Sequence, residues 1–289
     1  MPDTIPPGGC VGILGGGQLG RMLALAAARL GLRCHVYDPG PAPCAAQVSS
    51  GLTRAAFDDA AALRSFAAEV DVVTYEFENI DRSAVAFLAT LVPVRPGLRA
   101  LEVSSDRLSE KQFLNEIGLA TAPYRTVEDK DGLGAAAAEI GLPAILKTRR
   151  LGYDGKGQAR LSGSGDLDAA WERVGPGPAV LEGMIAFERE ISVIVARGLD
   201  GSVAAYDPAE NTHRDGILIE SRVPAAISRT RMQEAVLMAG RLVDALDYTG
   251  VAGVEMFVTG TGLLVNEFAP RVHNSGHWTQ DACLIDQFE

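Results

Sequence analysis

The first part of the chain alternates between short apolar runs and longer stretches with helical spacing. The apolar runs have the length of strands and cover Val11–Leu14, Arg33–Tyr37 and Val72–Thr74. Between them, apolar residues recur at helical spacing over Gln18–Leu30 and around 60–68. A strand that returns through a helix to the next strand is the unit of a parallel sheet. The pattern therefore predicts an α/β domain over residues 1–105, built on a doubly wound parallel sheet.

Residues 106–185 mix the two kinds of pattern in a different order. Helical patterns cover Asp106–Ile117 and Ala135–Ile140, and strand-like runs cover Tyr124–Val127 and Ala144–Lys147. A glycine-rich loop follows the second of these strands. The mixture favours a small α+β lobe.

From residue 179 onward strands dominate. Strand-like runs cover 179–185, 190–196, 216–223, 251–258 and 263–269. One long helix is expected after Ser228, whose hydroxyl suits an N-cap. Its apolar face would hold Ala235, Met238, Leu242, Ala245 and Leu246. Residues 186–289 would form a larger lobe, and Asp281–Glu289 resembles the first turns of an apolar helix, so we expect the domain to extend beyond this sequence.

Composition narrows the class of protein. A chain of 289 residues with 47% hydrophobic residues is expected to fold into two or three domains with sizeable cores. The net charge of −11 disfavours general nucleic-acid binding, because an acidic surface repels phosphate backbones. No apolar run is long enough to span a membrane, no signal-peptide pattern follows Met1, and the four cysteines do not look like a disulfide framework. These features favour a cytoplasmic protein.

The first glycine-rich loop raises the question of a nucleotide. Gly15, Gly17 and Gly20 fit the dinucleotide fingerprint G-x-G-x-x-G, and Asp38 lies near the position at which such sites bind a ribose. Any helix N-terminus that meets an anion also favours glycines, because free N–H groups must approach the ligand. This loop alone leaves a dinucleotide, another phosphorylated ligand and no ligand as equal alternatives.

A second glycine-rich loop carries positive charge. The stretch "ILKTRRLGYDGKGQ" contains the cations Lys147, Arg149, Arg150 and Lys156 and the glycines Gly152, Gly155 and Gly157. Glycines permit backbone conformations that expose N–H groups, so such a loop can fold over phosphates. The alternative is a lysine that extends to solvent beside a hydrated hairpin. Four cations with three glycines favour the phosphate loop, although the Walker A pattern is absent.

Two glutamates in the last predicted hairpin suggest a metal site. If Gly260-Thr261-Gly262 closes this hairpin as a three-residue loop, with Gly262 in the left-handed conformation, Glu255 pairs with Glu267 on one face. Opposed like charges are destabilising unless a cation compensates them. Mg²⁺ suits this role, because it prefers carboxylates together with phosphate oxygens. Asn266 could complete the coordination, and the alternative is a slipped register with both glutamates in water.

A polar cluster follows the hairpin directly. Arg271, His273, Asn274, Ser275 and His277 lie within seven positions. Arginine offers two parallel hydrogen bonds to a planar oxyanion, and the neighbouring side chains can donate or accept. We interpret the cluster as a site for an anionic substrate beside the transferred phosphate.

Together these motifs resemble the ATP-grasp superfamily and, within it, the N5-carboxyaminoimidazole ribonucleotide synthetases of purine biosynthesis. The matching stretches are "GILGGGQLGRM", "TYEFENI", "DRLSEKQFL", "ILKTRRLGYDGKGQ", "LEGMIAFEREISVI", "YDPAENTHRDGIL" and "EFAPRVHNSGHWT". The resemblance implies a pre-ATP-grasp domain followed by ATP-grasp lobes. It also implies a ligase reaction, in which ATP and bicarbonate form carboxyphosphate and the exocyclic amine of aminoimidazole ribonucleotide is carboxylated, with or without free CO₂.

The resemblance also assigns residues to ATP and Mg²⁺. ATP would contact Arg107, Lys147 and the loop Gly152, Tyr153, Asp154, Gly155, Lys156, Gly157 and Gln158. The adenine would lie along Glu182, Gly183, Met184 and Ile185, with Glu190 on the ribose and His213 near the nucleotide. Mg²⁺ would rest on Glu255 and Glu267, with Asn266 beside them.

On the substrate side, Arg271, His273, Asn274 and Ser275 would face bicarbonate and the imidazole, and Tyr153 and Asp154 would approach the imidazole substrate. Gly16, Gly17, Gln18, Leu19 and Glu76 would line the ribonucleotide site. The resemblance also implies a homodimer and a small C-terminal lobe, absent from this sequence, whose basic residues bind the substrate phosphate. We therefore expect weakened substrate binding in this chain.

Three rival interpretations follow from the same sequence. An NAD-dependent oxidoreductase explains only the first glycine loop. A different ATP-grasp ligase would act on another carboxylate and amine. A non-catalytic binding module would result if the chain were truncated. For Glu267→Gln, the opposed charges predict loss of phosphoryl transfer with folding kept or improved.

Overall fold

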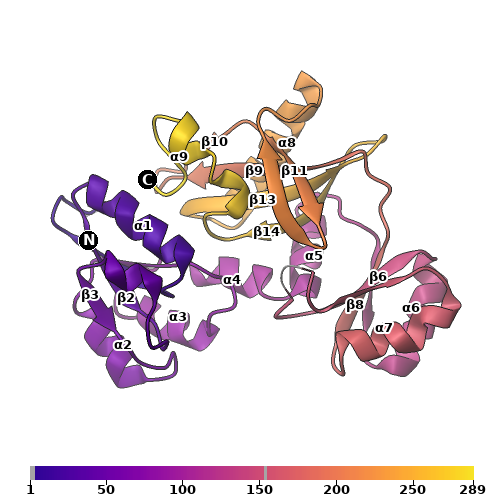
Figure 1. Ribbon diagram of the computed structural model, residues 1–289, viewed down its shortest axis with the longest axis horizontal. Helices are drawn as coiled ribbons and strands as arrows, with labels where there is room; N and C mark the ends of the chain where they lie inside the picture. Colours follow the sequence, from indigo (N-terminus) through magenta and orange to yellow (C-terminus); the bar gives the residue numbers. More distant parts are fainter. Residues whose placement is uncertain (1–3, 153–154) are drawn as a thin grey trace.

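The N-terminal lobe is a parallel sheet with helices on both faces. The computed structural model describes residues 4–152 and 155–289. The strands are β1 (Cys10–Leu14), β2 (Arg33–Tyr37), β3 (Gly51–Thr53) and β4 (Val72–Tyr75), in the order β3-β2-β1-β4. The helices are α1 (Gln18–Arg29), α2 (Ala60–Ala67), α3 (Arg82–Ala89) and α4 (Leu98–Ser104). Figure 1 shows this lobe in indigo and purple at one end of the molecule.

Neighbouring residues of one strand pack against different helices. Ile13 joins the core beneath α1, whereas Leu14 joins the core beneath α2 and α3. This follows from the pleat, because successive side chains of a strand point to opposite faces. The predicted doubly wound sheet is confirmed. The sequence analysis did not predict the strand β3, which is three residues long, or the helices α3 and α4.

The second lobe is a small antiparallel sheet covered by two helices. Its strands are β5 (Tyr124–Val127), β6 (Ala144–Thr148), β7 (Gln158–Leu161) and β8 (Ala179–Gly183), in the order β5-β8-β6-β7. The helices α6 (Lys130–Ile140) and α7 (Leu167–Val174) share its core. Helix α5 (Arg107–Glu116), predicted within this lobe, instead packs Phe113 and Leu114 into the core of the third lobe.

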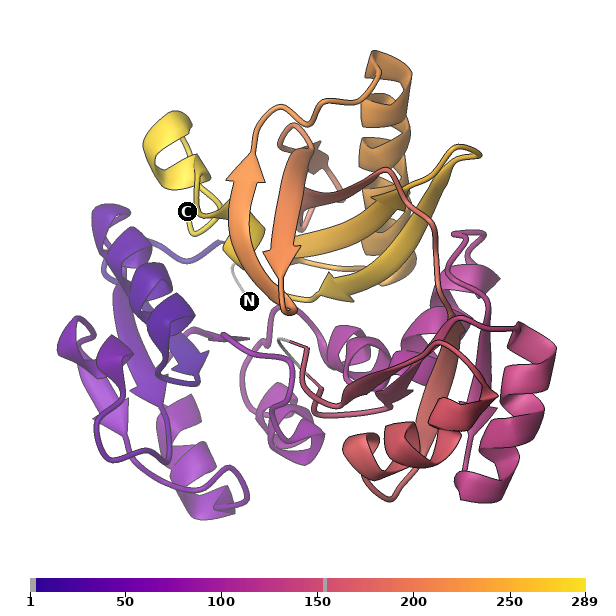
Figure 2. The ribbon, with the colours of Figure 1, turned by 45° about the vertical axis from the view of Figure 1, so that its right-hand side comes forward.

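The third lobe is an antiparallel sheet backed by one long helix (Figures 1 and 2). Its strands are β9 (Arg189–Arg197), β10 (Val203–Ala205), β11 (Ala209–Arg214), β12 (Ile217–Arg222), β13 (Gly250–Val258) and β14 (Leu263–Ala269), in the order β12-β11-β9-β13-β14 with β10 beside β9. Helix α8 (Arg229–Ala245) begins after Ser228, whose hydroxyl accepts from Arg231 N as predicted. Its predicted face was partly wrong, because Ala245 is exposed while Ala239 and Val243 are buried.

The hairpin of β13 and β14 pairs Glu255 with Glu267 as predicted, by a different route. The loop has four residues, 259–262, and Gly262 is not in the left-handed region. The four-residue loop alone would pair Glu255 with Asn266. A bulge after Glu255 shifts the register by one residue, so that Glu255 faces Glu267 while Met256 faces Val265.

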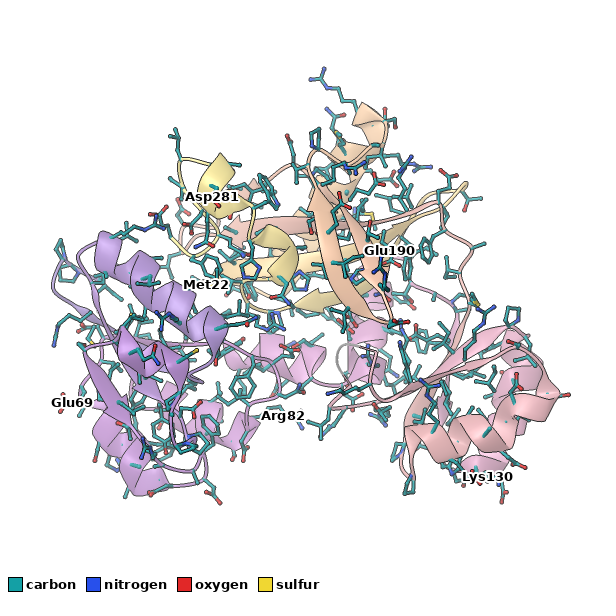
Figure 3. The ribbon with its side chains drawn as sticks, in the orientation of Figure 1. Met22, Glu69, Arg82, Lys130, Glu190 and Asp281 are labelled. Carbon is teal, nitrogen blue, oxygen red and sulfur yellow. The ribbon has the colours of Figure 1, made fainter. Side chains whose placement is uncertain are left out.

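The predicted helix at Asp281–Glu289 is wrong. Helix α9 is short, Thr279–Ala282, and Cys283–Glu289 runs back toward α1 without helical structure. Asp286 accepts from Arg29 of α1, and Phe288 packs against Leu19 and Val272. Tertiary contacts with α1 therefore replace the local helix. Figure 3 labels Met22 on α1, at this junction between the first and third lobes.

Candidate functional site

A cleft of about 500 Å³ contains most of the predicted site residues. Its lining includes Arg107, Lys147, Gly152, Gly155, Lys156, Gln158, Glu190, His213, Glu255, Asn266, Glu267, Arg271, His273 and Asn274. Other predicted residues are not part of this lining: Gly157, Glu182, Gly183, Met184, Ile185, Ser275, Gly16, Gly17, Gln18, Leu19 and Glu76. Tyr153 and Asp154 lie outside the described residues.

The two carboxylates of the hairpin have very different proton affinities. Burial and the charge of Glu267 raise the pKa of Glu255 to about 7. Burial acts in the same direction on Glu267, but Arg107 and Lys147 outweigh it and lower the pKa of Glu267 to about 2. Arg107 Nη1 donates to Glu267 Oε2 at 2.8 Å. Arg107 and Lys147 thus keep Glu267 ionised, whereas the negative charge of Glu267 makes ionisation of Glu255 unfavourable. A cation bound between the two carboxylates would offset this repulsion.

A buried network of charges fixes Lys147. Its Nζ donates to Glu182 Oε2 at 3.0 Å, and Lys111 Nζ lies 3.2 Å from Glu182 Oε1. Burial opposes ionisation of Glu182, but the two lysines lower its pKa. The Glu182 side chain is therefore occupied by the two lysines, and the prediction that the adenine lies along residues 182–185 stays a prediction about the strand.

The network includes residues that the sequence analysis missed. Lys111 and Glu110 of α5 are each no more than 3% exposed, and Glu110 Oε1 accepts from Phe268 N at 2.8 Å. Burial and Glu267 raise the pKa of Glu110 to about 8. The available signal was in "DRLSEKQFL", where two charged residues occupy the inward side of a helix otherwise held by Phe113 and Leu114.

The described part of the phosphate loop is shaped by its glycines. Gly155 and Gly157 have φ of +74° and +69°, which side-chain-bearing residues rarely adopt. A Cβ on Gly155 would lie 3.0 Å from the carbonyl oxygen of Asp215, in the turn between β11 and β12. Arg149 and Arg150 both donate to Asp106, the N-cap of α5, and this joins the loop to that helix.

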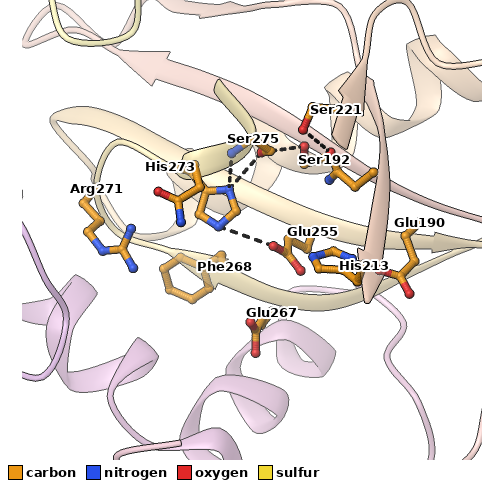
Figure 4. Close-up of polar contacts among 12 residues, drawn as sticks. Glu190, Ser192, His213, Ser221, Glu255, Glu267, Phe268, Arg271, His273 and Ser275 are labelled. Atoms are coloured by element: carbon orange, nitrogen blue, oxygen red, sulfur yellow. Dashed lines mark hydrogen bonds and ion pairs between the residues drawn. The ribbon is translucent and has the colours of Figure 1, made fainter. Parts of the chain in front are cut away.

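The polar cluster after the hairpin divides into residues that line the cleft and residues buried behind it. Arg271 Nε donates to Glu78 Oε2 at 2.6 Å, and His273 Nε2 lies 3.3 Å from Glu255 Oε1. Burial, reinforced by Arg271, lowers the pKa of His273 to about 4, so the ring is neutral at pH 7. Ser275 is fully buried behind the His273 ring (Figure 4), so the expectation that its side chain faces the cleft is wrong.

His213 and Glu190 form a second pair of residues in the lining of the cleft (Figure 4). His213 Nδ1 lies 2.5 Å from Glu190 Oε2, and the two residues come from the adjacent strands β11 and β9. The hydrogen bond with Glu190 outweighs burial and raises the pKa of His213. A neighbouring ribose hydroxyl would compete with His213 for Glu190.

We expect the imidazole of His213 to titrate above 6.5, and Glu190→Gln to lower its pKa. The folded pKa exceeds the unfolded one, so this pair stabilises the protein fully below pH 6.5 and loses that contribution as the pH rises through the folded pKa. Histidine ring signals followed by NMR against pH measure the shift, with His277 as the internal reference. A His213 pKa that is identical in both proteins would contradict the pairing.

The first glycine loop is filled by the chain's own carboxylates. Glu76 accepts from Gly17 N and, at 2.6 Å, from Gly20 N, at the start of α1. Asp38 Oδ2 accepts from Gly16 N at 2.8 Å. A pyrophosphate at this helix N-terminus would meet two negative charges instead of free N–H groups. The dinucleotide interpretation is therefore unfavourable.

The described residues contain neither a membrane-spanning helix nor a preformed metal cluster. Within 4–152 and 155–289, no helix combines the length and apolar character that crossing a membrane requires. Over the same residues, no group of three or more histidine, cysteine, aspartate or glutamate side chains could hold a metal ion. Glu255 and Glu267 alone would thus need further oxygen ligands, which phosphates can supply.

Comparison with known proteins identifies both halves of the chain. The ATP-grasp domain family matches residues 112–288, and the ribonucleotide synthetase preATP-grasp domain family matches residues 9–105. The N5-carboxyaminoimidazole ribonucleotide synthase of Brucella melitensis is 54% identical over 289 residues, which are 99% of this chain and 80% of that protein.

Solved structures that are similar to this chain carry the same family name. A crystal structure of an ADP complex of N5-carboxyaminoimidazole ribonucleotide synthetase matches with a TM-score of 0.96 at 43% identity, over 100% of this chain and 77% of the other. An N5-carboxyaminoimidazole synthase from Aspergillus clavatus, in complex with ADP and 5-aminoimidazole ribonucleotide, matches with a TM-score of 0.91 at 32% identity, over 98% and 75%.

Proposed function

We infer the function from the premise that the chain belongs to the N5-carboxyaminoimidazole ribonucleotide synthase family of ATP-grasp enzymes. Its activity is the ATP-dependent carboxylation of 5-aminoimidazole ribonucleotide to N5-carboxyaminoimidazole ribonucleotide in purine biosynthesis. One observation carries the assignment of this activity to the cleft: the pair Glu255 and Glu267 lies between cations of the ATP-grasp lobes and the cluster at Arg271 and His273.

We propose that bicarbonate supplies the carboxyl group. A bicarbonate oxygen attacks the γ-phosphorus of ATP, the bond to the β-phosphate oxygen breaks, and ADP leaves with carboxyphosphate formed. The amine nitrogen then attacks the carboxyl carbon, either of carboxyphosphate itself or of CO₂ released from it. The bond to phosphate breaks, phosphate leaves, and the amine loses a proton. Phosphoryl transfer depends mainly on positioning and charge neutralisation, which the buried cations of this cleft suit.

Mg²⁺ fits the residues present as a phosphate-bridging ion. Glu255 and Glu267 face each other on adjacent strands, and Asn266, in the bulge, hydrogen bonds to Glu255. The raised pKa of Glu255 supports this proposal, because a positive charge between the two carboxylates would favour ionisation of Glu255. When bound, Mg²⁺ would neutralise charge on the polyphosphate.

The chain's own residues have separate tasks in this proposal. Arg107 and Lys147 would neutralise phosphate oxygens, and the described loop residues Gly152, Gly155, Gly157 and Gln158 would help to exclude water from them. Glu190 accepts from the ribose. Arg271, oriented by Glu78, binds the oxyanion of bicarbonate or carboxyphosphate.

The ribonucleotide would lie between this cleft and the first glycine loop. Because Glu76 already fills the N-terminus of α1, we propose that the uncharged part of the ribonucleotide approaches this loop, with its phosphate elsewhere. A homodimer and a cytoplasmic location also remain proposals. The location is supported by the four cysteines, all in the described part of the chain, which are unpaired.

The test is ATP hydrolysis measured as phosphate release. We expect release that depends on both bicarbonate and 5-aminoimidazole ribonucleotide, with N5-carboxyaminoimidazole ribonucleotide as product. Binding of NADH without binding of ATP–Mg²⁺ would favour the oxidoreductase. Release that depends on a different amine would favour another ATP-grasp ligase, and binding of ATP without turnover would favour a non-catalytic module.

A further inference from the structure

Two buried serines connect to the His273 ring. Ser192 of β9 and Ser275 are 1% and 0% exposed. Ser192 Oγ donates to Ser275 Oγ at 2.7 Å, and Ser275 Oγ lies 2.8 Å from His273 Nδ1 (Figure 4). Ser192 lies in the stretch "LEGMIAFEREISVI", but the sequence analysis assigned it no role. The proposed reaction does not use it either.

The directions of these hydrogen bonds determine which ring nitrogen carries the proton. The backbone N–H of Ser275 also points at His273 Nδ1, at 3.4 Å, and a backbone N–H can only donate. Since the Ser275 hydroxyl accepts from Ser192, its own hydrogen is free to point at Nδ1 as well. Nδ1 is therefore an acceptor, and the neutral ring has its proton on Nε2.

The backbone of His273 is held as firmly as its ring. Gln287 Oε1 accepts from His273 N at 2.9 Å, and Gln287 Nε2 donates to His273 O at 2.8 Å. Gln287 is 2% exposed, so water competes little for these bonds. The ring can thus neither tilt nor exchange its two nitrogens without breaking buried hydrogen bonds.

We propose that Ser192 is a positioning residue that makes His273 a hydrogen-bond donor, through Nε2–H, toward negative charge in the cleft. In the ligand-free protein the acceptor is Glu255 Oε1, 3.3 Å away. During turnover, and here the inference rests on the proposed function, the same N–H faces the oxyanion that Arg271 binds. His273 therefore stabilises negative charge and does not remove a proton at Nε2.

The first test reads the tautomer of the ligand-free protein. ¹⁵N chemical shifts of labelled histidine distinguish a protonated from an unprotonated ring nitrogen. We expect Nε2–H for His273 in the wild type, a mixture of both tautomers in Ser192→Ala, and the wild-type pattern again in Ser192→Thr, which keeps the hydroxyl. Ser221→Ala is the matched control, because Ser221 Oγ donates at 2.8 Å to Asn211 and has no contact with His273.

The second test separates positioning from mere structure. We expect Ser192→Ala to lower kcat about tenfold with the KM for ATP unchanged, since one buried hydrogen bond is lost away from the nucleotide. Ser192→Thr should recover most of this loss.

Two outcomes would overturn the proposal. One is an Nδ1–H tautomer in the wild type, which needs no variant to fold. The other is a Ser192→Ala protein with an unchanged His273 spectrum. If the tautomer responds as expected while the wild type has no ligase activity, the proposed function fails and the assignment of the donor nitrogen stands.

Discussion

Replacing Glu267 by glutamine lowers the rate of phosphoryl transfer by about 10²-fold to 10³-fold, the range found when one preorganised charge contact of a transition state is removed. The structure gives the reason, because Glu267 is the carboxylate that Arg107 and Lys147 keep ionised in the cleft. Single-turnover phosphate release under saturating ATP measures the effect. A rate within threefold of the wild type would remove Glu267 from the proposed metal site.

The same substitution also distinguishes the two glutamates by stability. The pKa of Glu267 lies below its unfolded value, so its charge stabilises the fold above pH 4.5 and this is lost as the pH falls toward 2. The pKa of Glu255 is raised, so its contribution is present below pH 4.5 and lost as the pH rises through about 7.

At pH 8 without metal, we therefore expect Glu267→Gln to destabilise the protein and Glu255→Gln to stabilise it. For Glu267→Gln we expect about 1 kcal/mol, because the Glu267 side chain is 41% exposed in the cleft and water screens its charge. The Glu255 side chain is only 16% exposed, so the effect of Glu255→Gln should be the larger of the two. Urea unfolding in the presence of EDTA measures both. This differs from the sequence-based expectation that Glu267→Gln keeps or improves folding, because the sequence did not show that Arg107 and Lys147 lie beside Glu267.

Replacing Lys147 by methionine lowers kcat/KM for ATP by about 10²-fold. Methionine keeps the length and apolar stem of the side chain but removes the charge that we propose neutralises the phosphates. Glu182 retains Lys111, so the buried carboxylate keeps one partner and the protein should still fold. Isothermal titration with ATP–Mg²⁺ separates the loss of binding from the loss of rate.

The control for Lys147 is Lys130→Met. Lys130 forms an exposed ion pair with Asp168 on the outside of the small lobe, and such pairs contribute little to stability. Activity should be unchanged in this variant. If Lys147→Met keeps both the affinity and the rate of the wild type, Lys147 serves only to neutralise Glu182.

Much of the fold followed from local patterns. The strands β1, β2 and β4 of the first lobe were predictable because strand-length apolar runs alternate with helical spacing. Ser228 was predictable as an N-cap because its hydroxyl bonds within the same turn. The terminal segment failed for the opposite reason. The segment packs Phe288 against α1, which is distant in the sequence. The helix that the apolar spacing of Asp281–Glu289 predicted therefore does not form beyond Ala282.

In the candidate site, too, the residue types could be interpreted from the sequence, whereas their arrangement depended on the fold. The residue types at Glu255, Glu267, Arg271 and His273 indicate phosphate and anion chemistry by themselves. Their register did not follow from the loop we expected, because a bulge at Asn266 compensates for a longer turn.

The sequence by itself determined the class of fold, the glycine loops and the chemistry of the last hairpin, because spacing and residue type act over a few positions. Only the tertiary structure decided that Glu76 fills the first glycine loop, that Lys111 shares Glu182 with Lys147, and that Ser192 sets the proton of His273. Each of these depends on buried polar groups from distant segments satisfying one another, and no local pattern records that requirement.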